Sequence, residues 1–262
     1  MTTENGVFIR FDRVWKSLGD QVVLQNVSFD VRTGETLAVL GRSGVGKSVT
    51  LKHILGFLKA DEGQVEVGGR NVAQLTETEL NEMRRRVTMV FQSGALFDSL
   101  TAGENIAYPL RERALREPAL EDEDQIEAQV DRLLSLVDLS EARDLMPADL
   151  STGMKRAVAI ARALAANPEA ILYDEPTTMV DPLMAQTVSD LILKLKQHRG
   201  LTSIVVTHDM RLARKLADRA VFLVEGHVTF FGPMEELRAS PDPTIQDFIE
   251  LDEISFSGSR NR

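Results

Sequence analysis

Residues 41–48 read Gly-Arg-Ser-Gly-Val-Gly-Lys-Ser and directly follow the apolar run Thr36–Leu40. This spacing fits the pattern G-x-x-x-x-G-K-[ST], which requires a strand before it and a helix after it. Leu51, Ile54 and Leu55 supply helical spacing on the far side. The glycines let successive backbone N–H groups turn toward phosphate oxygens, and the helix N-terminus adds positive potential. The stretch therefore predicts a strand, loop and helix that bind nucleotide phosphates.

Side chains at the end of this phosphate loop (residues 41–48) predict its chemistry. Lys47 has the length to reach the β and γ phosphates, and Ser48 offers a hydroxyl ligand for Mg²⁺. The backbone around the phosphates comes from the rest of the loop: Gly41, Arg42, Ser43, Gly44, Val45 and Gly46. A glycine-rich turn with an incidental lysine is the simpler alternative, and the surrounding strand and helix argue against it.

A second apolar run, Ala170–Tyr173, ends in the carboxylates Asp174 and Glu175. Open α/β sheets bind ligands at the carboxyl ends of their strands, so we expect both side chains near the phosphates. Asp174 is placed to hold Mg²⁺ through water, and Glu175 to orient and deprotonate the water that attacks the γ-phosphate. Such a pair can also serve only as a helix cap, but the phosphate loop elsewhere in the chain favours hydrolysis.

The pattern of apolar residues predicts an α/β fold. Thr36–Leu40, Ala170–Tyr173 and Ser203–Val206 are near-continuous apolar runs, typical of parallel strands that are covered on both faces. Apolar residues at helical spacing follow each run, and this repeated order indicates a doubly wound parallel core. Residues 7–14 and 25–31 alternate between apolar and polar, which predicts an antiparallel strand pair.

The remaining segments suggest how the chain is divided. Residues 93–165 lack strand signals and predict a mostly helical insert, with a charged connection over Arg111–Gln125. Val221–Val224 and Val228–Phe231 predict a late strand pair. The expected division is a nucleotide-binding core with an antiparallel β subdomain, a helical subdomain and a C-terminal extension, over residues 1–92 with 166–240, 93–165 and 241–262.

The extension combines two patterns. Asp242–Leu251 has helical spacing, whereas Ser255–Arg262 predicts an irregular tail. Its apolar residues fit packing on its own chain, on a second copy or on a small regulatory protein, and the sequence does not choose among these.

Composition limits the classes of protein. The 262 residues are 43% hydrophobic and 27% charged, with 40 acidic against 30 basic residues and a net charge of −10. This acidity disfavours nucleic acid as a partner. The absence of cysteine excludes disulfides, thiolate metal sites and a thiol nucleophile. No apolar run approaches the roughly 20 residues that span a bilayer, and the first residues lack a leader pattern, so we expect a chain that is neither spanning nor exported.

Residues 150–154 read Leu-Ser-Thr-Gly-Met and precede an apolar and basic helix over Lys155–Ala166. This stretch resembles the signature motif of ATP-binding cassette (ABC) ATPases, usually Leu-Ser-Gly-Gly-Gln. The family's other motifs occur in the family's order: Gln92 after the run Val87–Phe91 resembles the Q-loop glutamine, Pro176–Asp181 the D-loop, and Thr207-His208-Asp209 the switch histidine. The resemblance covers roughly residues 7–240 and implies a P-loop NTPase (RecA-like) core that hydrolyses ATP.

The family's architecture implies two cassettes that face each other head to tail, most simply a homodimer. Each ATP would lie between one chain's phosphate loop and the other chain's signature helix, so that Ser151, Gly153 and Asp181 contribute to nucleotide binding. His208 would contact the γ-phosphate and hold Glu175 and the water in line, and Gln92 would take part in catalysis and in Mg²⁺ binding. The other histidines, His53, His198 and His227, receive no role.

Several positions depart from the family's pattern. Thr152 and Met154 replace glycine and glutamine in the signature motif, and the D-loop reads Thr178-Met179-Val180-Asp181 in place of Ser-Ala-Leu-Asp. Thr152 places a β-branched side chain close to the partner's phosphate, which is expected to weaken closure driven by ATP. Leu18 aligns with the aromatic residue that usually stacks on adenine, and Trp15 is either a substitute for it or a packing residue.

The segments Gln92–Phe97 and Glu104–Glu112 resemble the ATPase of Mla-type (MlaF-like) phospholipid transporters. That resemblance implies a peripheral subunit at the cytoplasmic face of the inner membrane, bound to a separate permease and to a lipid-carrying MCE-domain protein. Phe97, Leu100 and Tyr108 are candidate contacts to the permease. A cassette for another substrate, such as amino acids, is the alternative. The single acidic cassette disfavours action on ribosomes or DNA, and the presence of Glu175 and His208 disfavours a non-catalytic sensor.

Overall fold

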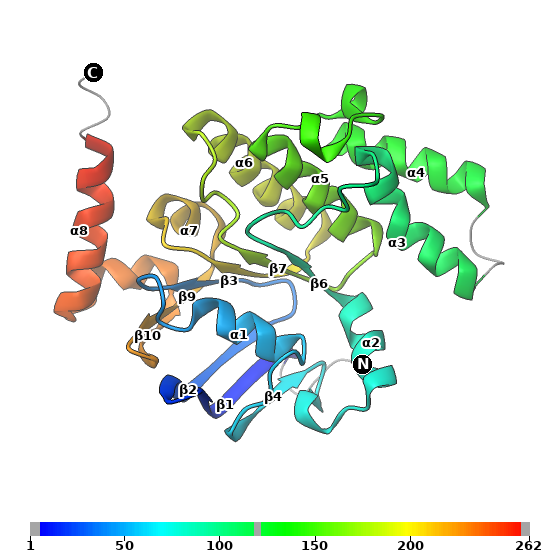
Figure 1. The fold of residues 1–262 in the computed structure, drawn as a ribbon. Coiled ribbons are helices and arrows are strands. Elements are labelled where there is room, and N and C mark those ends of the chain that lie inside the picture. Colours follow the sequence, from blue (N-terminus) through cyan, green and yellow to red (C-terminus); the bar gives the residue numbers. More distant parts are fainter. Residues whose placement is uncertain (1–5, 118–121, 258–262) are drawn as a thin grey trace. The chain divides into compact units, whose positions relative to one another are not determined.

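The computed structural model describes residues 6–117 and 122–257, and the chain folds into two compact units (Figure 1). The first unit comprises Met1–Arg84 and Leu195–Arg262, and the second comprises Arg85–Lys194. The finer limits expected for the core, the helical subdomain and the extension stay predictions.

A four-stranded antiparallel sheet in the first unit has the order β2-β1-β4-β5. Its strands are β1 (Val7–Leu18), β2 (Gln21–Arg32), β4 (Glu62–Val67) and β5 (Arg70–Asn71). Phe11 of β1 pairs with Phe29 of β2, and their rings stack with centroids 4.4 Å apart. The predicted antiparallel pair is confirmed, with strands that extend beyond the alternating segments. The sequence reasoning missed β4 and β5.

A second group of strands in the first unit has the order β10-β9-β3-β8. These are β3 (Thr36–Leu40), β8 (Thr202–Val206), β9 (Arg219–Val224) and β10 (His227–Pro233). β3 runs parallel to β8 and to β9, whereas β9 and β10 form the predicted antiparallel pair. Every residue of β3 and β8 is buried, which explains their near-continuous apolar sequences. Because Val39 lies opposite Val206, the loops after β3 and β8 leave from the same edge.

The helices of the first unit include the two expected after β3 and β8, α1 (Lys47–Ile54) and α7 (Met210–Leu216). The unit also holds most of α2 (Glu77–Arg86), the helix α8 (Pro243–Ser257) and 3₁₀ turns at Val72–Gln74 and Met234–Ala239. Neither α2 nor the two turns was predicted.

The C-terminal helix α8 packs on its own chain. Ile245, Phe248 and Ile249 are buried in a cluster with Phe222, and the Phe248 ring meets the Phe222 ring edge-on with centroids 5.0 Å apart. The irregular tail expected from Ser255 is corrected, because α8 continues to Ser257. Asp242 Oδ1 starts the helix by accepting from the amide of Thr244 at 2.8 Å, and a started helix extends at low cost. Residues 258–262 of the expected tail, like residues 1–5, lie outside the described part.

The second unit pairs two parallel strands, β6 (Val87–Val90) and β7 (Ala170–Asp174). Its helices are α3 (Ala102–Arg116), α4 (Glu123–Leu136), α5 (Thr152–Ala165) and the start of α6 (Pro182–Arg199), with 3₁₀ turns at Ser140–Ala142 and Pro147–Asp149. The predicted helical insert is therefore confirmed.

The charged connection expected over Arg111–Gln125 is corrected. α3 continues to Arg116, α4 begins at Glu123, and residues 118–121 lie outside the described part. Arg116 pairs with Glu112 at 3.2 Å one helical turn away, and Asp122 forms a capping box with Gln125. Local charge pairing and capping thus extend two helices through a segment whose charge had suggested a loop.

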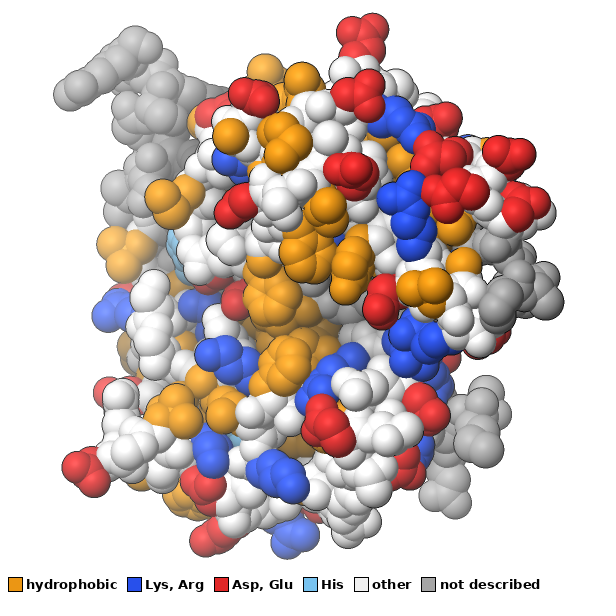
Figure 2. Space-filling view, turned by 45° about the vertical axis from the view of Figure 1, so that its right-hand side comes forward, with side chains coloured by type: hydrophobic (Ala, Val, Ile, Leu, Met, Phe, Trp, Pro, Cys, Tyr) orange, Lys and Arg blue, Asp and Glu red, His pale blue; other side chains and the backbone are white. Residues whose placement is uncertain are grey.

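Charged side chains of both signs are interspersed on the face drawn in Figure 2. Within residues 6–117 and 122–257, no helix has both the length and the apolar character that crossing a bilayer demands.

His53 of α1 makes stability depend on pH. Its side chain is 1% exposed, Nδ1 lies 2.8 Å from the carbonyl oxygen of Val49, and Nε2 is buried without a hydrogen-bond partner. Burial, aided by the charge of Lys16, lowers the pKa of His53, so the unfolded chain binds a proton more readily than the folded chain. Stability from neutral His53 is therefore complete above the unfolded pKa and is lost as the pH falls through and below it.

We expect urea unfolding from pH 7.5 to pH 5.5 to show falling stability, at a limiting slope of about 1.4 kcal/mol per pH unit from His53. His53→Phe should flatten this part of the profile. His227→Gln, at an exposed position, is the matched control and should keep it. A His53→Phe profile as steep as that of the unmodified chain would contradict the assignment.

Candidate active site

The phosphate loop connects β3 to α1 in the first unit. Gly46 is the N-cap of α1 with φ 103°, and Gly41 has φ 141°. A Cβ on Gly41 would lie 2.4 Å from the carbonyl oxygen of Leu223, and a Cβ on Gly46 would lie 2.8 Å from Leu24 Cδ2. Gly41 and Gly46 are therefore required both by their positive φ angles and by the lack of room for a Cβ. With glycine at these positions, the loop adopts the curled path predicted for it.

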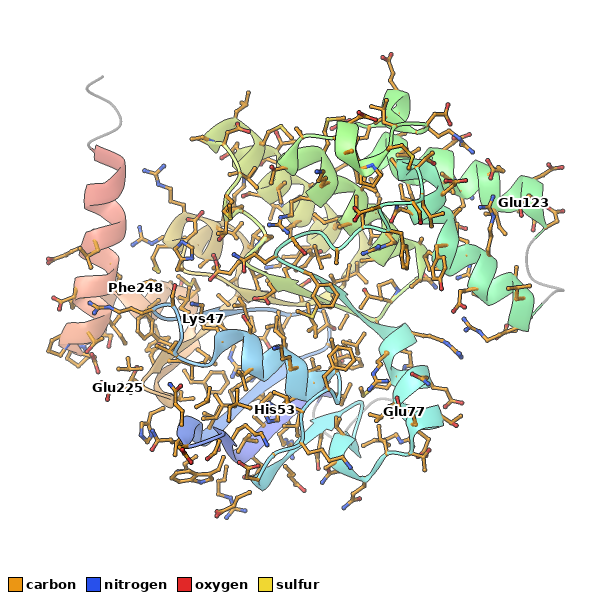
Figure 3. All side chains as sticks on the ribbon, in the orientation of Figure 1. Lys47, His53, Glu77, Glu123, Glu225 and Phe248 are labelled. Atoms are coloured by element: carbon orange, nitrogen blue, oxygen red, sulfur yellow. The ribbon has the colours of Figure 1, made fainter. Side chains whose placement is uncertain are left out.

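Lys47, the first residue of α1, points back into the loop. Its side chain is 6% exposed, and Nζ donates to the carbonyl oxygens of Gly41 at 2.8 Å and Arg42 at 3.1 Å (Figure 3). These bonds hold a buried ammonium group at the centre of the loop, where it suits phosphate oxygens. Ser48 follows in the first helical turn.

His208 lies at the same edge of the first unit as the phosphate loop. The amide of Thr207 donates to Val39 at 3.1 Å, which continues the pairing of β8 with β3. Asp209 caps α7, because its Oδ1 accepts from the amides of Arg211 and Leu212. His208 is thus an exposed side chain between two fixed neighbours, and the structure brings it to the edge that carries Lys47.

Gln92, Asp174 and Glu175 lie together at one edge of the second unit. Val90 pairs with Tyr173, so Gln92, two residues beyond β6, lies level with Glu175, and Asp174 is the last residue of the neighbouring strand β7. Glu175 is 9% exposed, and its φ of 48° is a left-handed conformation that non-glycine residues seldom adopt. Thr178 Oγ1 donates to Glu175 Oε2 at 3.1 Å, which orients the carboxylate.

The signature residues begin α5 in the second unit. Ser151 is the N-cap, and its Oγ accepts from the amide of Met154 at 3.2 Å. Thr152 is exposed, whereas Gly153 packs against α6 so closely that a Cβ there would lie 2.9 Å from Met184 Cβ. Asp181 caps α6 by accepting at Oδ1 from the amides of Leu183 and Met184.

Sequence reasoning missed Arg156 and Thr178 as contributors to this region. Arg156 is 2% exposed although it carries a charge, and its position directly before the apolar run Ala157–Ala161 of α5 was the available signal. The sequence identified Thr178 only as a departure from the usual D-loop, and its hydroxyl contact with Glu175 is evident only in three dimensions. Leu18 is 45% exposed and Trp15 is partly buried on β1, so neither fills an enclosed adenine pocket.

The predicted site residues are distributed over the two units. The first unit brings together the phosphate loop and His208, and the second brings together Gln92, Asp174 and Glu175 and also holds the signature residues at the start of α5. The phosphate loop, His208, Gln92 and Glu175 follow the carboxyl ends of parallel strands, and Asp174 is the last residue of β7, so these residues lie where α/β folds bind ligands.

Comparison with known proteins identifies the family. The family model described as ABC transporter matches residues 24–178. The chain belongs to the ABC transporter family. It is 38% identical to the intermembrane phospholipid transport system ATP-binding protein MlaF of Haemophilus influenzae, over 88% of this chain and 86% of that protein. It is 36% identical to the chloroplastic protein TRIGALACTOSYLDIACYLGLYCEROL 3 of Arabidopsis thaliana, over 95% of this chain and 75% of that protein.

Solved ABC cassettes have the same fold. A dimeric structure of the ATP-binding cassette MJ0796, in a post-hydrolysis state with ADP and Pi, matches with a TM-score of 0.78 and 32% identity. The match covers 86% of this chain and 98% of that one. The predicted P-loop NTPase fold is therefore confirmed, and the chain is an ATP-hydrolysing cassette.

The cassette's signature glycine is constrained by its own chain. Gly153→Ala should lower the free energy of unfolding by about 1–3 kcal/mol, because the added methyl group crowds Met184. The better helix propensity of alanine should offset up to about 1 kcal/mol of this loss. Urea unfolding measures the change. Thr152→Ala, at the exposed neighbouring position, is the control and should shift stability by no more than about 0.5 kcal/mol.

A double-mutant cycle separates this contact from a general effect on α5. In a Met184→Ala background, Gly153→Ala should lose the part of its cost that comes from Met184 Cε and Cγ, at 2.5 and 3.0 Å from the added Cβ, and keep the part that comes from the remaining Cβ at 2.9 Å. Equal costs in both backgrounds would show that Met184 is not the constraint.

Proposed function

We propose that this cassette drives phospholipid transport between membranes as the ATPase subunit of a complex with a separate permease. The observation that carries the proposal is the 38% identity to the phospholipid transport protein MlaF, which extends over 88% of this chain. The Arabidopsis relative, which is named after a glycolipid, supports a lipid substrate. A transporter of another substrate, such as amino acids, remains the alternative that experiment must exclude.

The residues of the proposed nucleotide site contact phosphate or Mg²⁺. Lys47 contacts the β and γ phosphates, and backbone amides of residues 41–46 surround them. Ser48, Gln92 and Asp174 offer hydroxyl, amide and carboxylate oxygens, the donor set that suits Mg²⁺. When bound, Mg²⁺ neutralises charge on the phosphate oxygens.

Hydrolysis is proposed to depend on Glu175. Its carboxylate, oriented by Thr178, accepts a proton from the water that attacks the γ-phosphate. His208 contacts the γ-phosphate and helps to align that water. The remaining rate enhancement comes from Lys47 and the amides of the phosphate loop, which stabilise charge in the transition state.

A second copy of the chain is the proposed first partner. The dimer of MJ0796 supports this arrangement. Across the dimer, Ser151 at the N-terminus of α5 faces the other chain's γ-phosphate, where the free amides and the helix dipole favour negative charge. Gly153 and Asp181 hold the adjacent backbone in place.

The permease is proposed to bind the surface near Gln92. The rings of Phe97 and Tyr108 lie 4.8 Å apart and are 43% and 45% exposed, with partly buried Leu100 on the same segment. Exposed, paired aromatic rings suit an inserted helix. The complex would place the chain at the cytoplasmic face of the inner membrane, with an MCE-domain protein and a small regulatory protein as further partners and no nucleic acid.

Two substitutions test the assignment of the ATP site. Lys47→Ala should weaken ATP binding roughly tenfold to a hundredfold, because one buried charged donor to phosphate is lost. Glu175→Gln should keep ATP binding, lower kcat by at least about a hundredfold and accumulate an ATP-bound dimer. Equilibrium ATP binding, phosphate release and light scattering measure these effects. Turnover by Glu175→Gln at the unmodified rate would contradict its role as the base.

Affinity purification from detergent-solubilised membranes tests the transport assignment. Recovery of a multi-spanning permease with an MCE-domain protein and bound phospholipid is the expected result. A permease that co-purifies with a solute-binding protein would support the alternative substrate class, and ribosomal proteins would overturn transport. Phe97→Ala with Tyr108→Ala should release the permease while ATP binding persists.

A further inference from the structure

Arg156 of the signature helix α5 occupies an unfavourable environment. It is 2% exposed, makes no ion pair within 4 Å among the described residues, and has a buried Nε without a hydrogen-bond partner. Burial lowers the pKa of Arg156, an effect that the charge of Asp174 opposes. Arginine stays charged in proteins, so burying Arg156 costs desolvation free energy and destabilises the folded state. A contribution to stability therefore does not explain why an arginine occupies this position.

The guanidinium of Arg156 bonds instead to two backbone carbonyls near the nucleotide-site residues. Nη1 donates to Phe91 O at 2.5 Å, immediately before Gln92. Nη2 makes a longer contact of 3.5 Å with Thr178 O, in the residue whose hydroxyl holds Glu175. One side chain of α5 thus contacts both segments that carry the hydrolytic residues of the second unit.

A second arginine of α5, Arg162, binds the other side of the same turn. Its Nη2 donates to Gly94 O at 3.2 Å, its Nη1 lies 3.4 Å from Asn105 Oδ1, and its guanidinium lies 5.6 Å from the centre of the Phe97 ring. Asn105 is fully buried, and its Nδ2 donates to Leu100 O at 3.0 Å. Arg162 therefore joins α5 to the segment that presents the aromatic pair.

Residues 91–94 are called the Gln92 turn here, and the carbonyl oxygens of its first and last residues accept from Arg156 and Arg162. Its ends are closed by the amide of Gly94, which donates to Phe91 O at 2.9 Å. Its backbone lies against α5, because a Cβ on Gly94 would be 3.4 Å from Lys155 O. Arg156 holds the carbonyl before Gln92, and Arg162 holds the carbonyl two residues after it.

We propose that Arg156 and Arg162 are positioning residues that clamp the Gln92 turn to the signature helix and so make the two ATP sites of a dimer cooperative. This inference rests on the proposed function. When the N-terminus of α5 binds the partner's nucleotide, the position of the helix shifts or becomes fixed. Because Arg156 and Arg162 bond α5 to neighbouring segments, the same change reaches Gln92 and Glu175 at the chain's own nucleotide. Binding at one site thereby prepares hydrolysis at the other.

Arginine suits this role better than lysine. Its planar guanidinium presents several donors in a rigid fork, so a single side chain reaches two carbonyls and transmits their relative position. A lysine retains the charge but offers one flexible ammonium group. The conservative replacement therefore separates loss of charge from loss of geometry.

The test compares Arg156→Met, Arg156→Lys and Arg162→Met in the full-length chain. Arg86→Met is the matched control, because it makes the same chemical change in the same unit at an exposed pair with Glu169. The measurements are the Hill coefficient of ATP hydrolysis, ATP affinity, and hydrogen exchange of peptides covering residues 91–97. Thermal unfolding confirms that each variant is folded.

We expect Arg156→Met and Arg162→Met to reduce the Hill coefficient from near its two-site limit of about 2 to about 1, with ATP affinity changed by less than about threefold. Exchange of the Gln92 turn should rise at least about fivefold. Arg156→Lys should restore stability but not cooperativity, and Arg86→Met should keep both.

The results distinguish failure of the clamp from failure of the proposed function. The proposed function holds if the unmodified chain hydrolyses ATP cooperatively and Glu175→Gln does not hydrolyse ATP. In that case, an unchanged Hill coefficient in Arg156→Met would overturn the clamp alone. If the unmodified chain lacks ATPase activity, the proposed function fails. Unchanged exchange at residues 91–97 in Arg156→Met would also overturn the clamp, whatever the activity.

Discussion

The bonds from Lys47 Nζ to the carbonyls of Gly41 and Arg42 are the constraint on which the phosphate loop depends. A buried ammonium group needs acceptors, and here the loop itself supplies them. The loop can curl far enough to do so because Gly41 and Gly46 adopt positive φ against the backbone carbonyl of Leu223 and the side chain of Leu24. The fully buried strand β3 fixes where the loop starts, and α1 fixes where it ends. The bonds of Lys47 therefore depend on the path of the loop, and the path of the loop depends on the buried strand and the helix at its two ends.

The helix α5 has a comparable place in the second unit, where it meets several requirements at once. Its N-terminus presents Ser151, its apolar residues fill the interior, and Arg156 and Arg162 reach backbone carbonyls on the segment around Gln92. An apolar helix would pack as well without these charges, and buried ion pairs are often replaceable by apolar groups without loss of stability. The two arginines therefore make sense as geometric links between segments, with stability supplied by the alanine, valine and isoleucine residues around them.

Sequence patterns predicted the parts of the fold that follow local rules. Buried strands, the helices that follow them and the β9–β10 pair all arise from periodicity or from residues adjacent in the chain. The missed features depend on distant residues or on charges that mislead. β4 and β5 are short polar strands that gain their place by pairing with β1, and the charged residues around Arg111 form helix because of capping and ion pairs. In the candidate site, motif residues were predictable by type and spacing, whereas the contacts of Arg156 and Thr178 required the tertiary structure.

Packing within the chain explains why the signature motif can differ from the usual sequence at position 152 but keeps glycine at position 153. Gly153 is buried against Met184, so this position is limited by the chain's own α6 whatever it contributes to nucleotide binding. Thr152 is exposed in the first turn of α5, where an additional side chain displaces nothing within its own unit. The fold therefore tolerates loss of the first glycine of the motif and is destabilised by loss of the second. Any effect of Thr152 must act through what approaches the exposed N-terminus of α5, which in the proposed dimer is the partner's γ-phosphate.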